Sequence, residues 1–269
     1  MFSTDCPRSP TRVDKMSFYD NFAEFYDNIV AGFDYSKVAE YYDGLIRQNG
    51  VSGGILLDLA CGTGTLSTLM ARKGWDVIGV DSSPEMLSIA AQRNDSSEPD
   101  KISYICQDMT ELDLYGTVDA AVCCFDSLNH ILEESDLRRV FEKVSLFMNH
   151  GGVFVFDINT IFCHETIFAD NIFTTDADDG GVFCARQHFK EKNNVTVIAL
   201  SIFARQENGL YERHNATNAE RAYALGPVKS LCEQSGFEIV GCYDFLTLNQ
   251  ADENNQRVVF VCSKTEKAV

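Results

Sequence analysis

The residues best suited to chemistry in this chain lie in one short segment, Asp58-Leu59-Ala60-Cys61-Gly62-Thr63-Gly64-Thr65. Gly62 and Gly64 let the backbone turn tightly and let a ligand approach without meeting a Cβ atom. Asp81 follows 19 residues after Gly62. A carboxylate there can accept hydrogen bonds from both hydroxyls of a ribose. The pattern therefore predicts a site for a cofactor that contains a nucleoside.

A nicotinamide dinucleotide is one such cofactor, but two details disfavour it. Ser67 replaces the third glycine of the usual G-x-G-x-x-G pattern. The carboxylate of Asp58 would also be unfavourable near a pyrophosphate, whereas beside the ammonium group of an amino acid it would help. A simpler interpretation, in which Asp58 only caps the following helix, stays open at this point.

Short apolar runs alternate with amphipathic segments around this motif. This rhythm is typical of parallel strands with helices on both faces of the sheet. The glycine segment follows the first strand, at the end of the sheet where open α/β folds bind ligands. We expect strands at 55–60, 76–80, 101–107, 118–125 and 153–158, and helices at 36–47, 65–73, 84–93 and 134–148.

The alternation stops after Asp157 and gives way to three long β-type runs between about 182 and 224. Asn193-Asn194 and Asn208-Gly209 separate these runs as turn signals. One more helix and two strands follow. The chain is therefore predicted to be α/β, with a Rossmann-like, doubly wound, mostly parallel seven-stranded sheet and a small inserted antiparallel β-sheet. The expected parts are a flexible tail at 1–15, a main domain at 16–158 and 225–269, and an inserted subdomain at 159–224.

Composition limits the partners of the chain. Its 269 residues include 22 Lys and Arg and 40 Asp and Glu, so the formal charge is 22 − 40 = −18. Such a chain repels phosphate backbones and anionic membranes unless it carries a basic patch, and no dense run of Lys and Arg is present. No apolar run reaches the roughly 18 residues of a membrane span. We expect a cytoplasmic protein that binds a small molecule, with no nucleic acid and no membrane as partners.

The ten cysteines contain no C-x-x-C pair, and most lie in apolar, strand-like runs. A free cysteine in such a run behaves as a small buried apolar side chain. We therefore expect neither disulfides nor a bound metal.

Taken together, the motifs resemble those of the class I S-adenosylmethionine-dependent methyltransferases. The family's first motif is an acid followed by a G-x-G loop, as in DLACGTG here, and its second is an acid before a helix, as in VDSSPEML. Gln107-Asp108-Met109 resembles a third family position. Within the family, the chain is similar to bacterial small-molecule methyltransferases and to amino-sugar N,N-dimethyltransferases.

The resemblance implies S-adenosyl-L-methionine as cofactor and gives roles to several residues. Gly62 and Gly64 would leave room for the methionine half, and Asp58 would face its ammonium group. Asp81 would hold the ribose hydroxyls. Further residues implied to contact the cofactor are Tyr26, Tyr35, Ala60, Ser82, Met86, Gln107, Asp108, Met109 and Phe125. The competing interpretation of Asp108, as a turn residue only, stays open.

The resemblance also implies how the acceptor is held. In the amino-sugar enzymes, residues that match Tyr19 and His130 lie by the acceptor nitrogen, so these two are the catalytic candidates. Asp126 and Asn129 are the next candidates, and Asp157 stays between a turn-forming role and a ligand role. The alternative that Tyr19 and His130 only pack or cap is also open.

The expected function is transfer of a methyl group from S-adenosylmethionine to a small-molecule acceptor, by in-line displacement onto N or O. Two alternatives remain at this stage. One is an NAD-dependent oxidoreductase, and the other is a non-catalytic cofactor-binding protein of the same fold.

Overall fold

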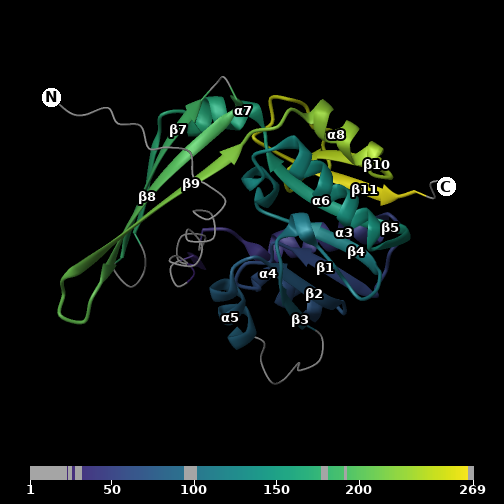
Figure 1. Cartoon of the computed structure of the whole chain (residues 1–269), viewed down its shortest axis with the longest axis horizontal. Coiled ribbons are helices and arrows are strands. Elements are labelled where there is room, and N and C mark those ends of the chain that lie inside the picture. The colour runs from purple at the N-terminus through teal and green to yellow at the C-terminus, as the bar shows by residue number, and fades with distance from the viewer. Residues whose placement is uncertain are drawn as a thin grey trace.

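The computed structural model describes residues 23, 26–27, 32–93, 102–176, 181–190 and 193–265. Its centre is a seven-stranded sheet with the strand order β10-β11-β5-β4-β1-β2-β3 (Figure 1). β1 to β5 are parallel to one another, while β11 pairs antiparallel with both β5 and β10. The strands are β1 (Ile55–Leu59), β2 (Asp76–Asp81), β3 (Ile102–Cys106), β4 (Val118–Cys123), β5 (Met148–Asn159), β10 (Phe237–Asp244) and β11 (Arg257–Lys264).

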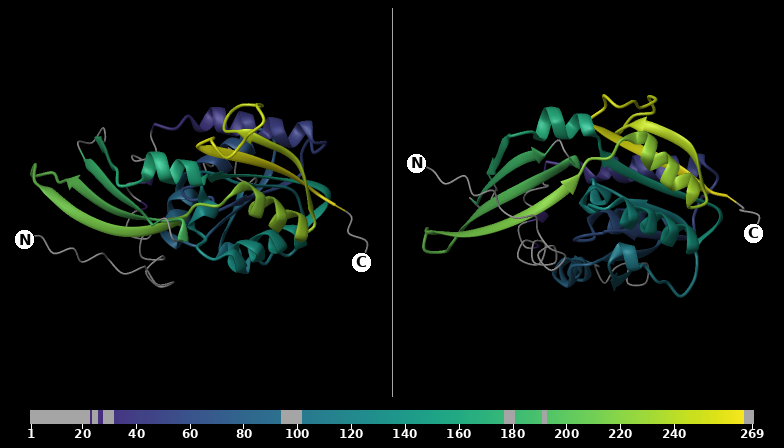
Figure 2. Two further views of the ribbon diagram at one scale, coloured as in Figure 1. Left: turned by 90° about the horizontal axis from the view of Figure 1, so that it is seen from above. Right: turned by 45° about the horizontal axis from the view of Figure 1, so that its top comes forward.

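Helices cover both faces of this sheet because the central strands are apolar on both sides. In β1, Leu56 faces the core formed with α3 and α4, while its neighbour Leu57 faces the core shared with α6 and α8. Figure 2 shows α3 on one side of the sheet and α6 and α8 on the other. The helices are α3 (Tyr35–Gln48), α4 (Thr65–Arg72), α5 (Pro84–Arg93), α6 (Glu134–Leu146) and α8 (Leu225–Gln234).

The parallel register brings the carboxyl ends of β1 to β4 to one edge of the sheet. Leu59 of β1 pairs with Val80 of β2, and Asp81 pairs with Cys106 of β3. The loops that follow these strands therefore begin side by side. This edge holds most of the residues that the sequence proposes for cofactor binding.

A second, four-stranded antiparallel sheet with the order β6-β7-β8-β9 interrupts the chain between β5 and α8. Figure 1 shows it extending away from the main sheet. A short α7 (Ile161–Cys163) and the π-helix η3 (His164–Phe168) lead into it. Asn194 and Gly209 adopt positive φ at the predicted turns, where these residue types are favoured. The strands are β6 (Ile172–Asp176), β7 (Val182–Lys190), β8 (Val195–Arg205) and β9 (Tyr211–Arg221).

The predicted fold class is confirmed, with two local corrections. The inserted sheet has four strands, whereas the sequence predicted three. The missed strand is β6, whose five residues are too few to stand out from the surrounding loop pattern. The predicted helix at 134–148 ends at Leu146, and Met148 already begins β5, so Gly151 and Gly152 lie within a strand.

Two further observations concern the whole described part of the chain. Its nine cysteines are all free, and seven of them are buried. Among the described residues, no helix is both long and apolar enough to cross a membrane.

Candidate active site

The loop between β1 and α4 takes an unusual backbone path. Ala60, Gly62 and Gly64 all have positive φ, at 60°, 55° and 74°. A Cβ atom built on Gly62 would meet no described atom within 4 Å, so this glycine borders open space. A Cβ atom on Gly64 would instead lie 2.4 Å from the hydroxyl of Tyr104. Gly62 thus leaves room for a ligand, whereas Gly64 is needed for packing at the start of α4.

Asp81 fixes the loop from the end of β2. Its Oδ2 accepts a hydrogen bond from the Gly62 N–H at 2.8 Å, and its Oδ1 accepts one from the Ser83 N–H at 2.9 Å. Ser83 caps α5, since its Oγ accepts from the Met86 N–H. Burial raises the pKa of Asp81 above its ordinary value, although these backbone donors oppose the shift. Each carboxylate oxygen keeps a lone pair that a ligand hydroxyl can use.

Asp58 is buried beneath the same loop. Its Oδ2 accepts a hydrogen bond from the Ser67 hydroxyl at 2.5 Å. Ser67 lies inside α4, whose N-cap is Gly64, so Asp58 does not cap this helix. Burial raises the pKa of Asp58 to about 6. Asp58 and Tyr35 line a small cavity beside the loop, and burial raises the pKa of Tyr35 to about 12.

A larger cavity of about 460 Å³ lies against this edge of the sheet. That volume is within the range of small-ligand sites. Asp108 lines it and also caps the 3₁₀-helix η1 (Met109–Glu111) by accepting from the Thr110 N–H and hydroxyl. The predicted residues that line the cavity are Tyr26, Ala60, Gly62, Asp81, Ser82, Met86, Gln107, Asp108, Met109, Phe125 and His130.

A strained turn follows β4 and borders the same cavity. Phe125 and Asp126 are consecutive non-glycine residues with φ of 55° and 53°, a conformation that costs about 1–3 kcal/mol per residue. The buried carboxylate of Asp157 holds both, because its two oxygens accept from their N–H groups at 2.8 Å. Arg257 bridges Asp157 and Asp126, with N–O distances of 2.9 and 2.6 Å. The ring of Phe125 and the carboxylate of Asp126 are thereby fixed.

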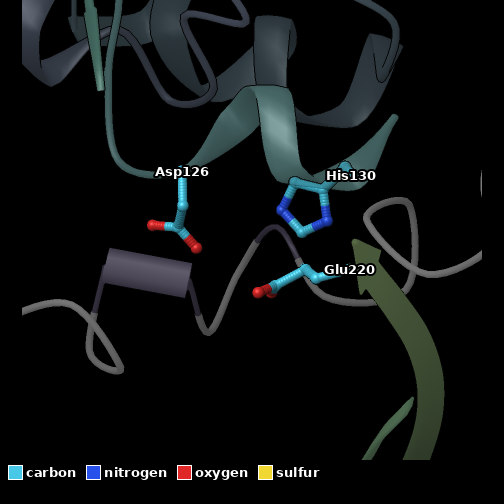
Figure 3. A group of neighbouring side chains, drawn as sticks. All are labelled: Asp126, His130 and Glu220. Atoms are coloured by element: carbon cyan, nitrogen blue, oxygen red, sulfur yellow. The ribbon is translucent and has the colours of Figure 1, made fainter. Parts of the chain in front are cut away.

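The other end of the cavity is formed together with the inserted sheet. His130 ends the 3₁₀-helix η2 (Ser127–His130), and its Nδ1 lies 3.0 Å from the side-chain amide nitrogen of Asn218 in β9. Both residues line the cavity. Figure 3 shows Asp126, His130 and Glu220 converging from two different elements. One ligand atom from each of these three lies within 4.8 Å of the others.

Asn129 joins the inserted sheet to this segment. Its buried side-chain amide donates to the carbonyl oxygens of Asn159 and Arg221, each at 2.9 Å, and its oxygen accepts from the Asn159 N–H. Asn159 ends β5 and Arg221 ends β9, so one side chain ties together both ends of the insert. Asn129 is therefore a positioning residue for the insert.

Similar proteins point to one family. A family model described as a methyltransferase domain matches residues 56–152. A protein of Geobacillus sp. (strain WCH70) that bears the name of a methyltransferase is 30% identical over 247 residues, which are 91% of this chain and 99% of that protein.

The chain belongs to the S-adenosylmethionine-dependent methyltransferases. A crystal structure of such an enzyme from Clostridium acetobutylicum ATCC 824 superposes with a TM-score of 0.82 at 29% identity, covering 92% of this chain and 99% of that one. A dTDP-3-amino-3,6-dideoxy-alpha-D-glucopyranose N,N-dimethyltransferase of Streptomyces fradiae is 30% identical over 149 residues, 55% of this chain and 56% of that enzyme. Family membership confirms the predicted enzyme class and cofactor, and it disfavours both alternatives that the sequence left open.

The structure of this methyltransferase gathers most of the predicted site residues around the two cavities. Gly64 lines neither of them, and Tyr19 lies outside the described residues. Sequence reasoning missed Asn218, Glu220 and Arg257. Asn218 and Glu220 are two residues apart in a strand, so their side chains lie on the same face of the inserted sheet. The sequence pattern does not show which face of that sheet borders the cavity.

Proposed function

We propose that the enzyme binds S-adenosylmethionine in the larger cavity and transfers its methyl group to N or O of a small acceptor at the end near His130. The observation that supports this is the continuity of the cavity. It runs from Asp81 at the end of β2 and Met109 in η1 to His130 and to Asn218 of the inserted sheet. Cofactor and acceptor would thus share one space.

The residues around the larger cavity suit the cofactor. Gly62 leaves space that a side chain would fill, and Asp81 presents carboxylate oxygens for the ribose hydroxyls. Met86 offers a soft apolar surface for a purine, and the Asp108 carboxylate lies at the same end. In the adjoining small cavity, the buried carboxylate of Asp58 would balance the ammonium of the methionine half.

When bound, the cofactor supplies an activated methyl group on a sulfonium. The protein then has to position the acceptor and exclude water rather than create a strong nucleophile. Phe125 lines both cavities, and its aromatic ring would face the positive charge. His130 and, from the sequence, Tyr19 would hold the acceptor or take its proton.

Ligand-induced stabilisation tests the cofactor, and a turnover assay tests the reaction. We expect S-adenosylmethionine and S-adenosylhomocysteine to raise the melting temperature and NAD to leave it unchanged. Incubation with methyl-labelled cofactor and a panel of small amines and alcohols should transfer the label to at least one of them. Stabilisation by NAD alone would contradict the proposal. So would cofactor binding without label transfer to any small acceptor.

A further inference from the structure

Glu220 is a buried acid that the cofactor does not explain. It lies near the end of β9 and is 5% exposed. Its Oε2 has no hydrogen-bond partner among the described residues. A buried carboxylate oxygen without a partner is costly and rare in folded proteins. Its position therefore calls for a bound donor.

The neighbouring charged groups already have partners. Asp126 forms an ion pair with Arg257, and the Nδ1 of His130 is close to the amide of Asn218. Glu220 faces the same space from β9 (Figure 3). Within this cluster, Glu220 is thus the carboxylate with an oxygen that no donor reaches from the described part of the chain.

The same face of the inserted sheet carries other polar side chains. Asn218 and Glu220 alternate along β9, and Gln187 lies across the sheet in register with Ile198 and Asn218. Gln187 is 9% exposed, and its Oε1 also has no partner among the described residues. Two buried, unpartnered acceptor atoms on one face point to a ligand that donates hydrogen bonds.

The charge pattern favours an ammonium group over a divalent metal ion. A dication held by all three residues would lie next to the Arg257 guanidinium, which already neutralises Asp126. That repulsion is strong in a buried site. An ammonium needs only one carboxylate and supplies the N–H donors that the unpartnered oxygens lack.

We propose that Glu220 binds the ammonium group of an amine acceptor and takes the proton that its nitrogen must lose before methylation. The proposal rests on the proposed function and narrows its acceptor to an amine. In the proton step, an N–H bond breaks, the proton forms an O–H bond on Glu220, and the nitrogen keeps the electron pair. That pair then forms the N–C bond as the C–S bond of the cofactor breaks.

Without a bound amine Glu220 favours its protonated form, and the positive charge of a bound ammonium would favour the carboxylate that pairs with it. Burial and the nearby charge of Asp126 raise its pKa well above the ordinary value of a glutamate, while Arg257 opposes the shift. A carboxylate in such surroundings has a high affinity for a proton.

A matched pair of probes tests the inference without the natural acceptor. Cyclohexylammonium chloride and cyclohexanol have similar shapes but differ in charge. Their affinities for the S-adenosylhomocysteine-bound protein would be measured by calorimetry at pH 7.5 for wild type, Glu220→Gln and Glu212→Gln. Glu212 lies on the same strand but is exposed, so its variant controls for the loss of one negative charge.

We expect wild type and Glu212→Gln to bind the ammonium at least about tenfold more tightly than the alcohol, and Glu220→Gln to lose this preference. Equal binding of the two probes by wild type, including no binding of either, would overturn the inference. So would a preference that persists in Glu220→Gln.

Two controls accompany these titrations. Equal S-adenosylhomocysteine affinity and equal melting temperature in all three proteins would show that the variants fold. Failure of wild type to bind S-adenosylhomocysteine would instead contradict the proposed function. Zinc chloride and magnesium chloride would be titrated in the same way. Binding of either metal to wild type but not to Glu220→Gln, with no preference between the two probes, would identify a metal site. That result would also overturn the inference.

Discussion

The two ends of the larger cavity are built in different ways. The end proposed for the cofactor comes mostly from consecutive loops of the core, between Ala60 and Glu111. The end proposed for the acceptor is lined by residues of η2 and β9, and Asp157 of β5 and Arg257 of β11 hold the turn before η2 in place. These elements are far apart in the chain. The residues of the first end are therefore close together in the sequence and form a local motif. Those of the second end come together only when the insert and the last strand pack against the core.

The two ends also differ in their electrostatics. Around the glycine loop, carboxylates accept hydrogen bonds from backbone N–H groups and from a serine hydroxyl. Around the strained turn, a buried arginine balances two aspartates, and a third acid keeps an oxygen without a donor among the described residues. Binding of a common cofactor and selection of a particular acceptor would thus depend on separate groups.

Removal of the insert is the strongest test of this separation. Replacing residues 160–224 by a short glycine–serine loop should lower turnover at least about 100-fold, because His130 and Asp126 would lose the wall that encloses the acceptor. S-adenosylhomocysteine affinity, measured by calorimetry on the same protein, should change far less. Normal methylation by the shortened protein would contradict a role for the insert at the acceptor end.

His130→Asn probes the acceptor end with a single side chain. If His130 holds the acceptor or takes its proton, kcat should fall about 100-fold while cofactor affinity stays within about twofold. His150→Asn is the matched control, since His150 is exposed in β5. Tyr19→Phe should behave like His130→Asn if the acceptor is an amine. Full turnover in both variants would show that the acceptor lies elsewhere.

Asp81→Ala probes the cofactor end. Loss of hydrogen bonds to a charged group costs roughly 1.5–3 kcal/mol, so S-adenosylmethionine should bind about ten- to a hundredfold more weakly. Asp76→Ala is the control, because Asp76 is exposed at the opposite end of the same strand. Calorimetric affinities of the two variants within about twofold of each other would rule out the ribose role of Asp81.

The pH dependence of cofactor affinity sharpens the role of Asp58. Its pKa of about 6 means that it is mostly protonated below pH 6 and ionised above. If the ionised form holds the ammonium of the cofactor, affinity should fall about tenfold from pH 7 to pH 5. Asp58→Asn should remove most of this dependence, as measured by calorimetry across that range.

The same shift has the opposite effect on stability. A carboxyl whose folded-state pKa is raised stabilises the fold at low pH, and this contribution is lost as pH rises through about 6. Asp58→Asn should therefore raise the melting temperature of the ligand-free protein at pH 7.5. An unchanged or lower melting temperature would mean that the hydrogen bond from Ser67 outweighs the cost of burying the charge of Asp58.

The sequence predicted the core and its glycine loop because both depend on local patterns. Strand periodicity and the capping residues of α5 are set by neighbours in the chain. Glu220 and Arg257 could not be found in this way. The role of Arg257 comes from the pairing of β11 with β5, about 100 residues earlier in the chain. The role of Glu220 comes from the packing of β9 against η2.

Asp157 and Asn129 illustrate the same limit on prediction. The sequence left Asp157 between a turn former and a ligand, and treated Asn129 as a reserve candidate for the acceptor. Asp157 instead supports two strained residues and Arg257. Asn129 bonds to backbone groups at sequence separations of 30 and 92 residues. No spacing rule links partners that far apart.

The attachment of the insert through Asn129 has a consequence for how such enzymes diversify. Because one amide binds the last residues of β5 and β9, the intervening chain forms a closed loop whose two ends are already aligned. A different hairpin or sheet of another length can occupy that place without changing the strand order of the core. If the insert encloses the acceptor as proposed, exchanging the chain between Asn159 and Arg221 among related enzymes should change the preferred acceptor and leave cofactor binding intact.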